Sequence, residues 1–201
     1  LCQHLIPYAE NGNRKRDHPA HYSPKNPWVK DAFGEFNLYV SRLGKLIANS
    51  TEIVNVAMLH PIRSGYFDYK REAVGFGIGQ QDVQLWEDCR LLSKNCINYH
   101  FLDETLLEKH GFVQGNQIGC GKCSYDYLIL PHVLTMDIST EKLLRQYVEN
   151  GGKVLVLGDT PNYLEGEPYC YDYLHSNCTF ADILKAQPVS IGSTEHNLYC
   201  S

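Results

Sequence analysis

Residues 125–161, with the sequence YDYLILPHVLTMDISTEKLLRQYVENGGKVLVLGDTP, decide the fold of this chain. Two apolar runs, 125–131 and 153–157, have the length and composition of buried strands. The amphipathic segment between them begins at Ser139 and Thr140, which can cap a helix, and ends at the glycine pair 151–152, which tolerates a left-handed C-cap. A strand, a crossover helix and a second strand predict a right-handed βαβ unit. The helix face expected to pack on the sheet comprises Leu143, Leu144, Tyr147 and Val148.

The rest of the chain fits a parallel α/β domain built around this unit. Pro27 opens an amphipathic segment that predicts a long helix over residues 27–50. The nearly continuous apolar run 52–59 predicts a central strand, and residues 98–103 predict another. Just before the core strand, glycine-rich turns predict a β-hairpin. Further helices are expected at 81–95, 104–110 and 180–185. The expected buried face of helix 81–95 comprises Val83, Trp86 or Leu85, Cys89 and Leu92.

The predicted fold class is therefore α/β, with a doubly wound, mainly parallel sheet, an inserted β-hairpin and a long N-terminal helix. Residues 1–26 are polar and lack periodicity, so we expect an extended linker there. Residues 27–201 are expected to form a single α/β domain, with a core at 27–161 and a loop-rich tail at 162–201.

Composition and charge argue against several classes of protein. A hydrophobic content of 43% and a charged content of 20% are ordinary for a folded globular chain and argue against disorder. A net charge of -5, without a long basic run, gives no basis for binding nucleic acid. No apolar run approaches the roughly 18 residues of a membrane span, and the first residues lack the pattern of a signal peptide. We expect a cytoplasmic, bacterial-type protein without nucleic-acid or membrane partners.

The eight cysteines are too diluted over 201 residues to indicate a disulfide scaffold. We expect mostly reduced thiols, with pairing of Cys170 and Cys178 in the tail as the exception. Cys120 and Cys123 form a C-x-x-C motif, which can supply two zinc ligands or a redox pair. No second motif completes four ligands, so two turn cysteines are the favoured interpretation. No cofactor or metal is expected, and Cys120 and Cys123 are the candidate ligands if a metal binds.

Candidate binding residues gather where ligands of open α/β sheets bind, at the carboxyl ends of the strands. A second group lies in the basic stretch near the N-terminus, where guanidinium groups offer fork-shaped donors. Simpler interpretations are a solvated charge run, strand-end histidines bonded to backbone, and an aspartate that caps a turn. The candidates are Arg14, Arg16, Asp17, His60, Arg63, Ser64, Tyr66, His132 and Asp159.

The same strand ends lack an evident nucleophile. A class I glutamine amidotransferase needs a Cys at a bent strand-to-helix elbow and a His later in the chain. The three apolar strands are instead followed by His60-Pro61, Pro131-His132 and Gly158-Asp159. Asp103 and Glu104 are adjacent carboxylates, but the pattern does not place them across a glycosidic bond. We therefore expect no catalytic residue in this chain.

Several motifs resemble parts of large bacterial glycoside hydrolases. The stretch from Asn13 to Pro19, Pro27-Trp28, the long helix and the run from Met58 to Ile62 look like the segment that follows the catalytic barrel of the α-L-rhamnosidase type, family 106. The later motifs are similar to the β-galactosidase trimerisation domain of family 42, whose class I amidotransferase-like, flavodoxin-like fold lacks the nucleophile. These motifs are Leu102-Asp103-Glu104, Ser124-Tyr125-Asp126-Tyr127, Leu130-Pro131 and the run from Tyr147 to Val154.

The resemblance implies a non-catalytic accessory or assembly domain of a glycoside hydrolase, with α-L-rhamnosides among the substrates. In such enzymes the acid and base lie on the preceding barrel, which needs about 200–250 residues of its own. Residues 1–26 would then be a linker or remnant of that catalytic domain, and the chain a fragment. The implied partners are the barrel, carbohydrate and further copies of the chain. A stand-alone small-molecule hydrolase or amidotransferase-like enzyme that uses the same crevice is the alternative, and a thiol- or zinc-dependent module is a third.

Overall fold

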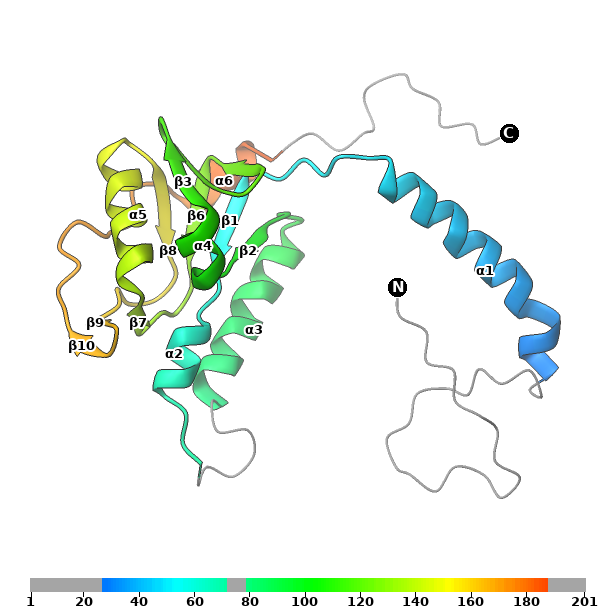
Figure 1. Ribbon diagram of the computed structural model, residues 1–201, viewed down its shortest axis with the longest axis horizontal. Coiled ribbons are helices and arrows are strands. Elements are labelled where there is room, and N and C mark those ends of the chain that lie inside the picture. Colours follow the sequence, from blue (N-terminus) through cyan, green and yellow to red (C-terminus); the bar gives the residue numbers. More distant parts are fainter. Residues whose placement is uncertain (1–26, 72–78, 188–201) are drawn as a thin grey trace. The chain divides into compact units, whose positions relative to one another are not determined.

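The computed structural model describes residues 27–71 and 79–187 (Figure 1). Contacts divide the chain into two compact units, Leu1–Glu52 and Ile53–Ser201. Helix α1, Pro27–Ala48, belongs to the first unit, and the other described helices and strands belong to the second. This division falls after the long helix, whereas the sequence pattern places the domain boundary before it.

Helix α1 forms where the sequence predicts it. It starts at Pro27, whose fixed φ and missing N–H suit a first helical position. At its other end, the Asn49 side-chain amide donates to the Lys45 carbonyl oxygen at 2.8 Å. Apolar side chains of this helix remain open to solvent: Phe36 is 44% exposed and Ile47 is 61% exposed, so the described residues of this unit leave its apolar face uncovered. None of the described helices, α1 included, combines the length and hydrophobicity needed to cross a membrane.

The centre of the second unit is a sheet of four parallel strands in the order β2-β1-β6-β8. In register, Met58 of the central strand β1 lies between Phe101 of β2 and Ile129 of β6. The predicted α/β class and parallel pairing are confirmed, although each strand is shorter than its apolar run. The strand bounds are β1 Val56–Leu59, β2 His100–Leu102, β6 Tyr127–Leu130 and β8 Lys153–Val156.

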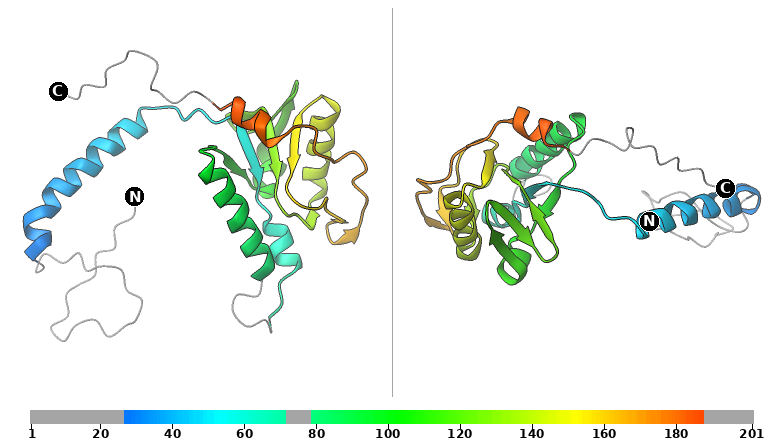
Figure 2. Two further views of the ribbon diagram at one scale, coloured as in Figure 1. Left: turned by 180° about the vertical axis from the view of Figure 1, so that it is seen from behind. Right: turned by 90° about the horizontal axis from the view of Figure 1, so that it is seen from above.

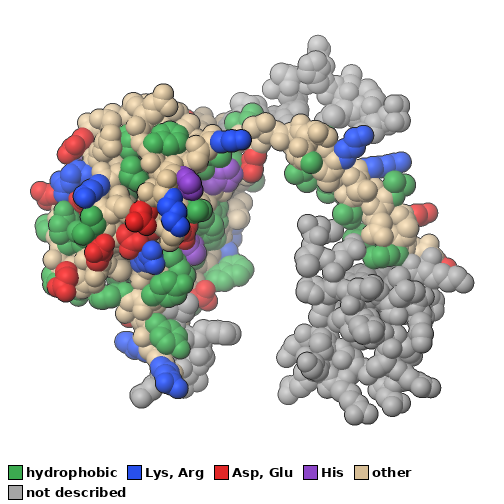
Figure 3. Space-filling model, in the orientation of Figure 1, with side chains coloured by type: hydrophobic (Ala, Val, Ile, Leu, Met, Phe, Trp, Pro, Cys, Tyr) green, Lys and Arg blue, Asp and Glu red, His purple; other side chains and the backbone are tan. Residues whose placement is uncertain are grey.

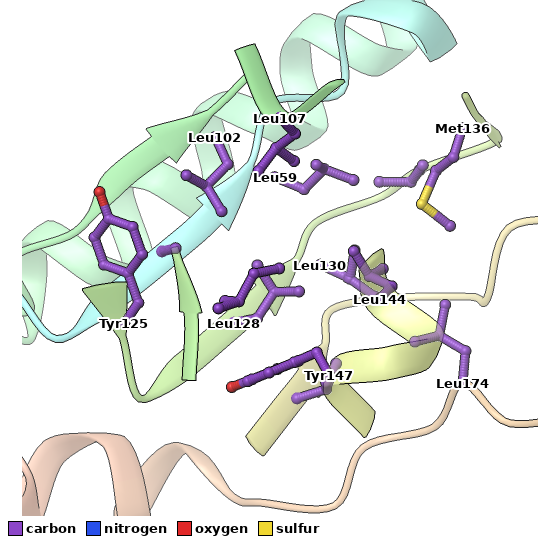
Figure 4. Packing of buried hydrophobic residues seen from close by; sticks show 14 of the residues in the cluster. Leu59, Leu102, Leu107, Tyr125, Leu128, Leu130, Met136, Leu144, Tyr147 and Leu174 are labelled. Carbon is purple, nitrogen blue, oxygen red and sulfur yellow. The ribbon is translucent and has the colours of Figure 1, made fainter. Parts of the chain in front are cut away.

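Helices cover both faces of this sheet (Figures 1 and 2). Successive strand residues point to opposite faces, so Leu128 joins one hydrophobic cluster and Ile129 the other. The first cluster includes Leu144 and Tyr147, which lie close to Leu128 and Leu130 in Figure 4. The first face is covered by α4 Glu104–His110 and α5 Ile138–Glu149, and the second by α3 Gly79–Lys94 and α6 Phe180–Lys185.

The face of α3 differs in part from the prediction. Leu92 is fully buried and Leu85 and Cys89 pack against the second cluster, as expected. Val83 is 54% exposed and Trp86 is 65% exposed, so the bulkiest side chain of the helix lies outside the core. Asp88, a charged residue that the hydrophobic pattern passes over, is buried on this helix instead.

The decisive stretch forms the predicted strand, helix and strand. Helix α5 runs from Ile138 to Glu149, and Gly151 follows it at φ +82°, the left-handed region that glycine adopts most readily. The predicted start at Ser139 and Thr140 is wrong by about two residues. Asp137 is the N-cap residue, and Thr140 lies inside the helix, fully buried. A short strand, β7 Thr135–Met136, precedes the helix.

The predicted hairpin is present and is extended by one strand. Strands β3 Gly111–Gln114, β4 Gln117–Cys120 and β5 Cys123–Tyr125 form an antiparallel sheet of three strands. Its two turns lie at Gly115-Asn116 and Gly121-Lys122, and both glycines have positive φ values. Ile118 and Tyr125 carry this small sheet into the first hydrophobic cluster.

The tail contributes to the core more than its composition suggests. Strand β9 Tyr163–Leu164 pairs with β7 on one side and with β10 Glu167–Pro168 on the other, in a second small sheet. Asn177 lies along β8, accepting from the Val154 N–H and donating to the Gly152 carbonyl oxygen, each at 2.7 Å. The expected Cys170–Cys178 disulfide is absent, because both cysteines are free thiols in this structure. Helix α6 then returns to the second face through Ile183, which is fully buried.

Candidate functional site

The carboxyl ends of the four parallel strands meet along one edge of the sheet, and the switch point lies between β1 and β6. From β1 the chain first moves outward to β2 and then returns past β1 to β6. Ligands of open α/β sheets bind outside such a point. His60 follows β1 there, and His132 follows β6 after one proline. This edge is therefore the candidate functional site.

His60 lines a small pocket at the end of β1. Its ring packs edge-on against Phe101, with 5.2 Å between ring centroids, which orients the imidazole. The pocket has a volume of about 160 Å³. Its polar lining comes from His60, Gln81 and Asp82, and its other lining residues are Pro61, Ile62, Gly65 and Leu85. A group of a few heavy atoms, such as part of a sugar ring, fits this volume.

Arg63 and Ser64 lie on α2, Ile62–Phe67, and both are engaged in contacts between elements. The Arg63 Nε donates to Asp137 Oδ2 at 3.0 Å, and its Nη2 donates to Thr105 Oγ1 at 3.2 Å. The fully buried Ser64 hydroxyl accepts from the backbone N–H of Leu134 at 2.9 Å. Both side chains therefore hold α2 against neighbouring elements, and the ligand-binding role predicted for them stays a prediction.

Glu104 is a buried carboxyl at this edge, and the sequence pattern did not single it out as a site residue. Only 1% of its surface is exposed, at the first position of α4. Burial is the main cause that raises its pKa, to about 7, and the nearby Asp137 charge adds to the rise. A hydrogen bond from the Asp137 N–H and the charge of Arg63 act in the opposite direction. A carboxyl that titrates near neutrality is thus built into the fold.

The N-terminus of α5 is satisfied by carboxylates from distant elements. Asp137, the N-cap residue, makes no side-chain cap, since its carboxylate accepts from Arg63. Instead, Glu104 accepts from the Asp137 N–H at 2.7 Å, and Glu165 accepts from the Ile138 N–H at 3.4 Å. The helix dipole favours negative charge at this end. These contacts join α2, α4 and the β9–β10 turn to one helix end.

The His132 imidazole contacts an aspartate and lies in space that a glycine leaves open. Its Nδ1 lies 3.3 Å from Oδ2 of the buried Asp88 of α3. Burial raises the pKa of Asp88, and the hydrogen bond from His132 partly opposes that rise. Gly158, at φ +88°, leaves room for the imidazole, because a Cβ there would lie 2.4 Å from His132 Nε2. Pairing with a carboxylate fixes the orientation of a histidine, and a fixed orientation is one requirement for a histidine that acts as a general base.

The structure does not bring the remaining predicted residues into one site. Tyr66 is 68% exposed at the end of α2, and Asp159 is exposed after β8. On the face of the second unit seen in Figure 3, acidic and basic side chains are interspersed. The predicted residues Arg14, Arg16 and Asp17 lie outside the described residues.

Cys120 and Cys123 lie opposite each other on β4 and β5. Within residues 27–71 and 79–187, no group of three or more His, Cys, Asp or Glu side chains is arranged to hold a metal ion. The motif offers two cysteine ligands, whereas a structural zinc site needs four ligands.

Comparison of the sequence with models of known families finds no match, and comparison with curated proteins finds no significant match. The resemblance to glycoside hydrolases thus stays a prediction that rests on the motifs quoted above. The chemistry of the candidate site follows from its geometry.

Proposed function

We propose that the Ile53–Ser201 unit is a non-catalytic accessory domain of a glycoside hydrolase, with a doubly wound sheet of the flavodoxin-like or class I amidotransferase-like type. The strand order β2-β1-β6-β8 supports this fold, because it matches the start of the flavodoxin-like order 2-1-3-4-5. The partner is the catalytic barrel of the parent enzyme, and the substrate class is carbohydrate that includes α-L-rhamnosides. The free thiols of the described cysteines favour the cytoplasm, where reducing systems maintain them.

One observation carries the non-catalytic role: polar groups at the strand ends connect elements of the fold. Arg63, Ser64 and Glu104 direct their hydrogen bonds to the segment 134–137. In the described part of the chain, no hydroxyl or thiol hydrogen-bonds to the imidazole of His60 or His132. A nucleophile activated by an adjacent base requires such a pair. The edge is thus better suited to rigid docking than to covalent catalysis.

The pocket beside His60 supports a role at the rim of a carbohydrate site. Its imidazole and the Asp82 carboxylate offer hydrogen bonds to hydroxyl groups, while Leu85 and Ile62 offer an apolar surface to a sugar ring. The small volume fits one edge of a monosaccharide and not a whole oligosaccharide. Assembly is the second part of the role, supported by the apolar face of α1 that the described residues leave exposed.

The test is an assay of the full 201-residue chain against aryl glycosides, α-L-rhamnoside included, with circular dichroism to show that the chain is folded. We expect a folded chain without hydrolysis above a mock-purified control. L-rhamnose should shift the NMR signals of His60 and leave those of the exposed His175 unchanged. Hydrolysis that disappears in His60→Ala would contradict the proposal. An unshifted His60 signal would show that the pocket beside His60 does not bind L-rhamnose.

The pair of His132 and Asp88 favours one alternative, a stand-alone small-molecule hydrolase. A histidine oriented by a buried carboxylate is part of the arrangement that activates a nucleophile or a water molecule. Such an enzyme would hydrolyse small esters or amides, and His132→Ala would abolish that activity while the fold is retained. Equal background rates in the wild type and His132→Ala would exclude the alternative.

A further inference from the structure

The hairpin of β4 and β5 brings the two cysteines of the C-x-x-C motif to directly opposite positions. Cys120 ends β4, Cys123 begins β5, and the register pairs the two. Gly121 opens the turn at φ +63°, a conformation that glycine adopts readily. Opposite residues of antiparallel strands have Cα atoms about 4.5–5.5 Å apart, within the range of about 4.4–6.8 Å that a disulfide spans. The register therefore places the two Cα atoms within the span of a disulfide.

The two thiols differ in their surroundings. Cys123 is exposed, whereas Cys120 is partly buried and its Sγ donates to the Leu106 carbonyl oxygen of α4 at 3.6 Å. Burial raises the pKa of Cys120, and the neighbouring Cys123 adds to this rise. Both residues are free thiols in this structure. Cys123 is thus the accessible thiol, and Cys120 lies where it can react second.

We propose that Cys120 and Cys123 form a reversible internal disulfide by exchange with a small-molecule disulfide such as oxidised glutathione. The Cys123 thiolate attacks one sulfur of oxidised glutathione, which forms a mixed disulfide and releases one glutathione thiolate. The Cys120 thiolate then attacks the Cys123 sulfur, which forms the internal S–S bond and releases the second glutathione. The protein loses two electrons and two thiol protons, and both pass to the two glutathione molecules.

The geometry of the hairpin makes this bond easy to reduce. Opposite Cβ atoms of antiparallel strands lie about 4.5–5.5 Å apart, whereas a disulfide needs about 3.8 Å. The hairpin must tighten to form the bond, and strained disulfides are the labile, regulatory ones. Oxidation also removes the Cys120 S–H that donates to the Leu106 carbonyl oxygen, so the contact between the hairpin and α4 changes with the redox state.

The experiment uses trypsin, because Lys122 lies between the two cysteines. The purified full chain is equilibrated in glutathione buffers of graded redox ratio, alkylated, digested without reductant and analysed by mass spectrometry. We expect peptides 110–122 and 123–142 to be linked, or the uncut peptide 110–142 to be lighter by two hydrogen atoms. Since the closing thiol is intramolecular, the internal disulfide should exceed the Cys123 mixed disulfide by about tenfold or more.

Matched variants separate this reaction from general thiol reactivity. Cys120→Ser should leave Cys123 as a stable glutathione mixed disulfide, because the second thiol is gone. Cys170→Ser removes another exposed cysteine and should leave the linkage unchanged. The proposal is overturned if wild-type Cys123 carries glutathione to the same extent as Cys170 at every ratio, or if it links to a different cysteine.

Discussion

At the scale of single residues, Glu104 shows how the surroundings of a carboxyl set its pKa. The sequence Asp103-Glu104 predicts the start of a helix, and Asp103 does cap α4 by accepting from the Thr105 N–H at 2.9 Å. Glu104 turns inward instead, to the Asp137 N–H. A buried carboxyl beside a second carboxylate is costly to ionise, which explains why its pKa lies near 7.

The Glu104→Gln variant should change how stability depends on pH. The pKa of Glu104 is about 7 in the folded protein and 4.5 in its unperturbed form. Its contribution to stability is therefore complete below pH 4.5 and is lost as the pH rises through about 7. This difference corresponds to about 3 kcal/mol. Urea denaturation across this pH range should show the decline in the wild type and not in Glu104→Gln.

The matched control for that measurement is Glu108→Gln. Glu108 is an exposed carboxyl on the same helix. Its variant should keep the decline of the wild type. An identical pH profile for Glu104→Gln and the wild type would show that Glu104 does not titrate in this range.

Tyr147 is a second residue whose structural role is larger than the helical period of apolar residues predicts. The helical period predicts only that its ring is buried, which it is. Its hydroxyl also accepts from the Lys153 N–H at 2.9 Å and lies 2.9 Å from the Asp126 carbonyl oxygen. The hydroxyl therefore joins the starts of β6 and β8 across the end of the sheet.

Tyr147→Phe should lower the free energy of unfolding by about 1–3 kcal/mol, because buried backbone groups lose their partner while the ring stays packed. Thermal denaturation followed by circular dichroism measures this. Tyr66→Phe is the control, since the Tyr66 side chain is 68% exposed, and its stability should match the wild type. A Tyr147→Phe variant as stable as the control would mean that water replaces the hydroxyl.

At the scale of elements, the end of α5 depends on two glycines for different reasons. Gly151 adopts φ +82°, which costs other residues conformational energy. Gly152 is buried against Tyr147, and a Cβ there would lie 2.3 Å from the Tyr147 ring. The first glycine serves the backbone, and the second makes space for a core side chain.

The two alanine variants should therefore differ. Gly151→Ala should cost about 1 kcal/mol, the usual price of a left-handed non-glycine residue. Gly152→Ala should cost about 1–3 kcal/mol or more, because the buried Tyr147 ring must move and its hydroxyl loses its hydrogen bonds. Urea denaturation of both variants decides this. If Gly151→Ala proves the more damaging of the two, the packing explanation for Gly152 is wrong.

At the scale of the whole molecule, the tail completes the domain. Tyr171 and Leu174 enter the first hydrophobic cluster and Ile183 enters the second. Asn177 and Ser176 satisfy backbone groups along the outer edge of β8. An uncovered strand edge invites pairing with other chains, and this segment prevents it.

A chain that ends at Pro161 should therefore fail to unfold cooperatively and should aggregate. Each buried side chain contributes about 1.5–3 kcal/mol. The loss of three approaches a typical total stability of about 5–15 kcal/mol. A chain that ends at Gln187 keeps all three and should unfold cooperatively. Light scattering and thermal denaturation compare the two, and a cooperative transition in the shorter chain would contradict this role of the tail.

Most of the helices and strands follow from local residue patterns. The period of apolar residues and the capping residues predict α1, α4, α5, α6 and the strands of the parallel sheet, because helix and strand preferences depend on residues a few positions apart. The errors of these predictions are local too: Val83 and Trp86 of α3 are exposed although they share the apolar period.

The strand order and the chemistry of the strand ends depend on contacts between distant segments. Glu104 meets Asp137 across 33 residues of sequence, and Asp88 meets His132 across 44. Burial and electrostatic partners change the pKa of a carboxyl, and neither is encoded in the spacing of nearby residues. The positions of His60 and His132 at the carboxyl ends of the strands could thus be predicted. Their partners, and the bonds that occupy Arg63 and Ser64, come from the packing of distant segments.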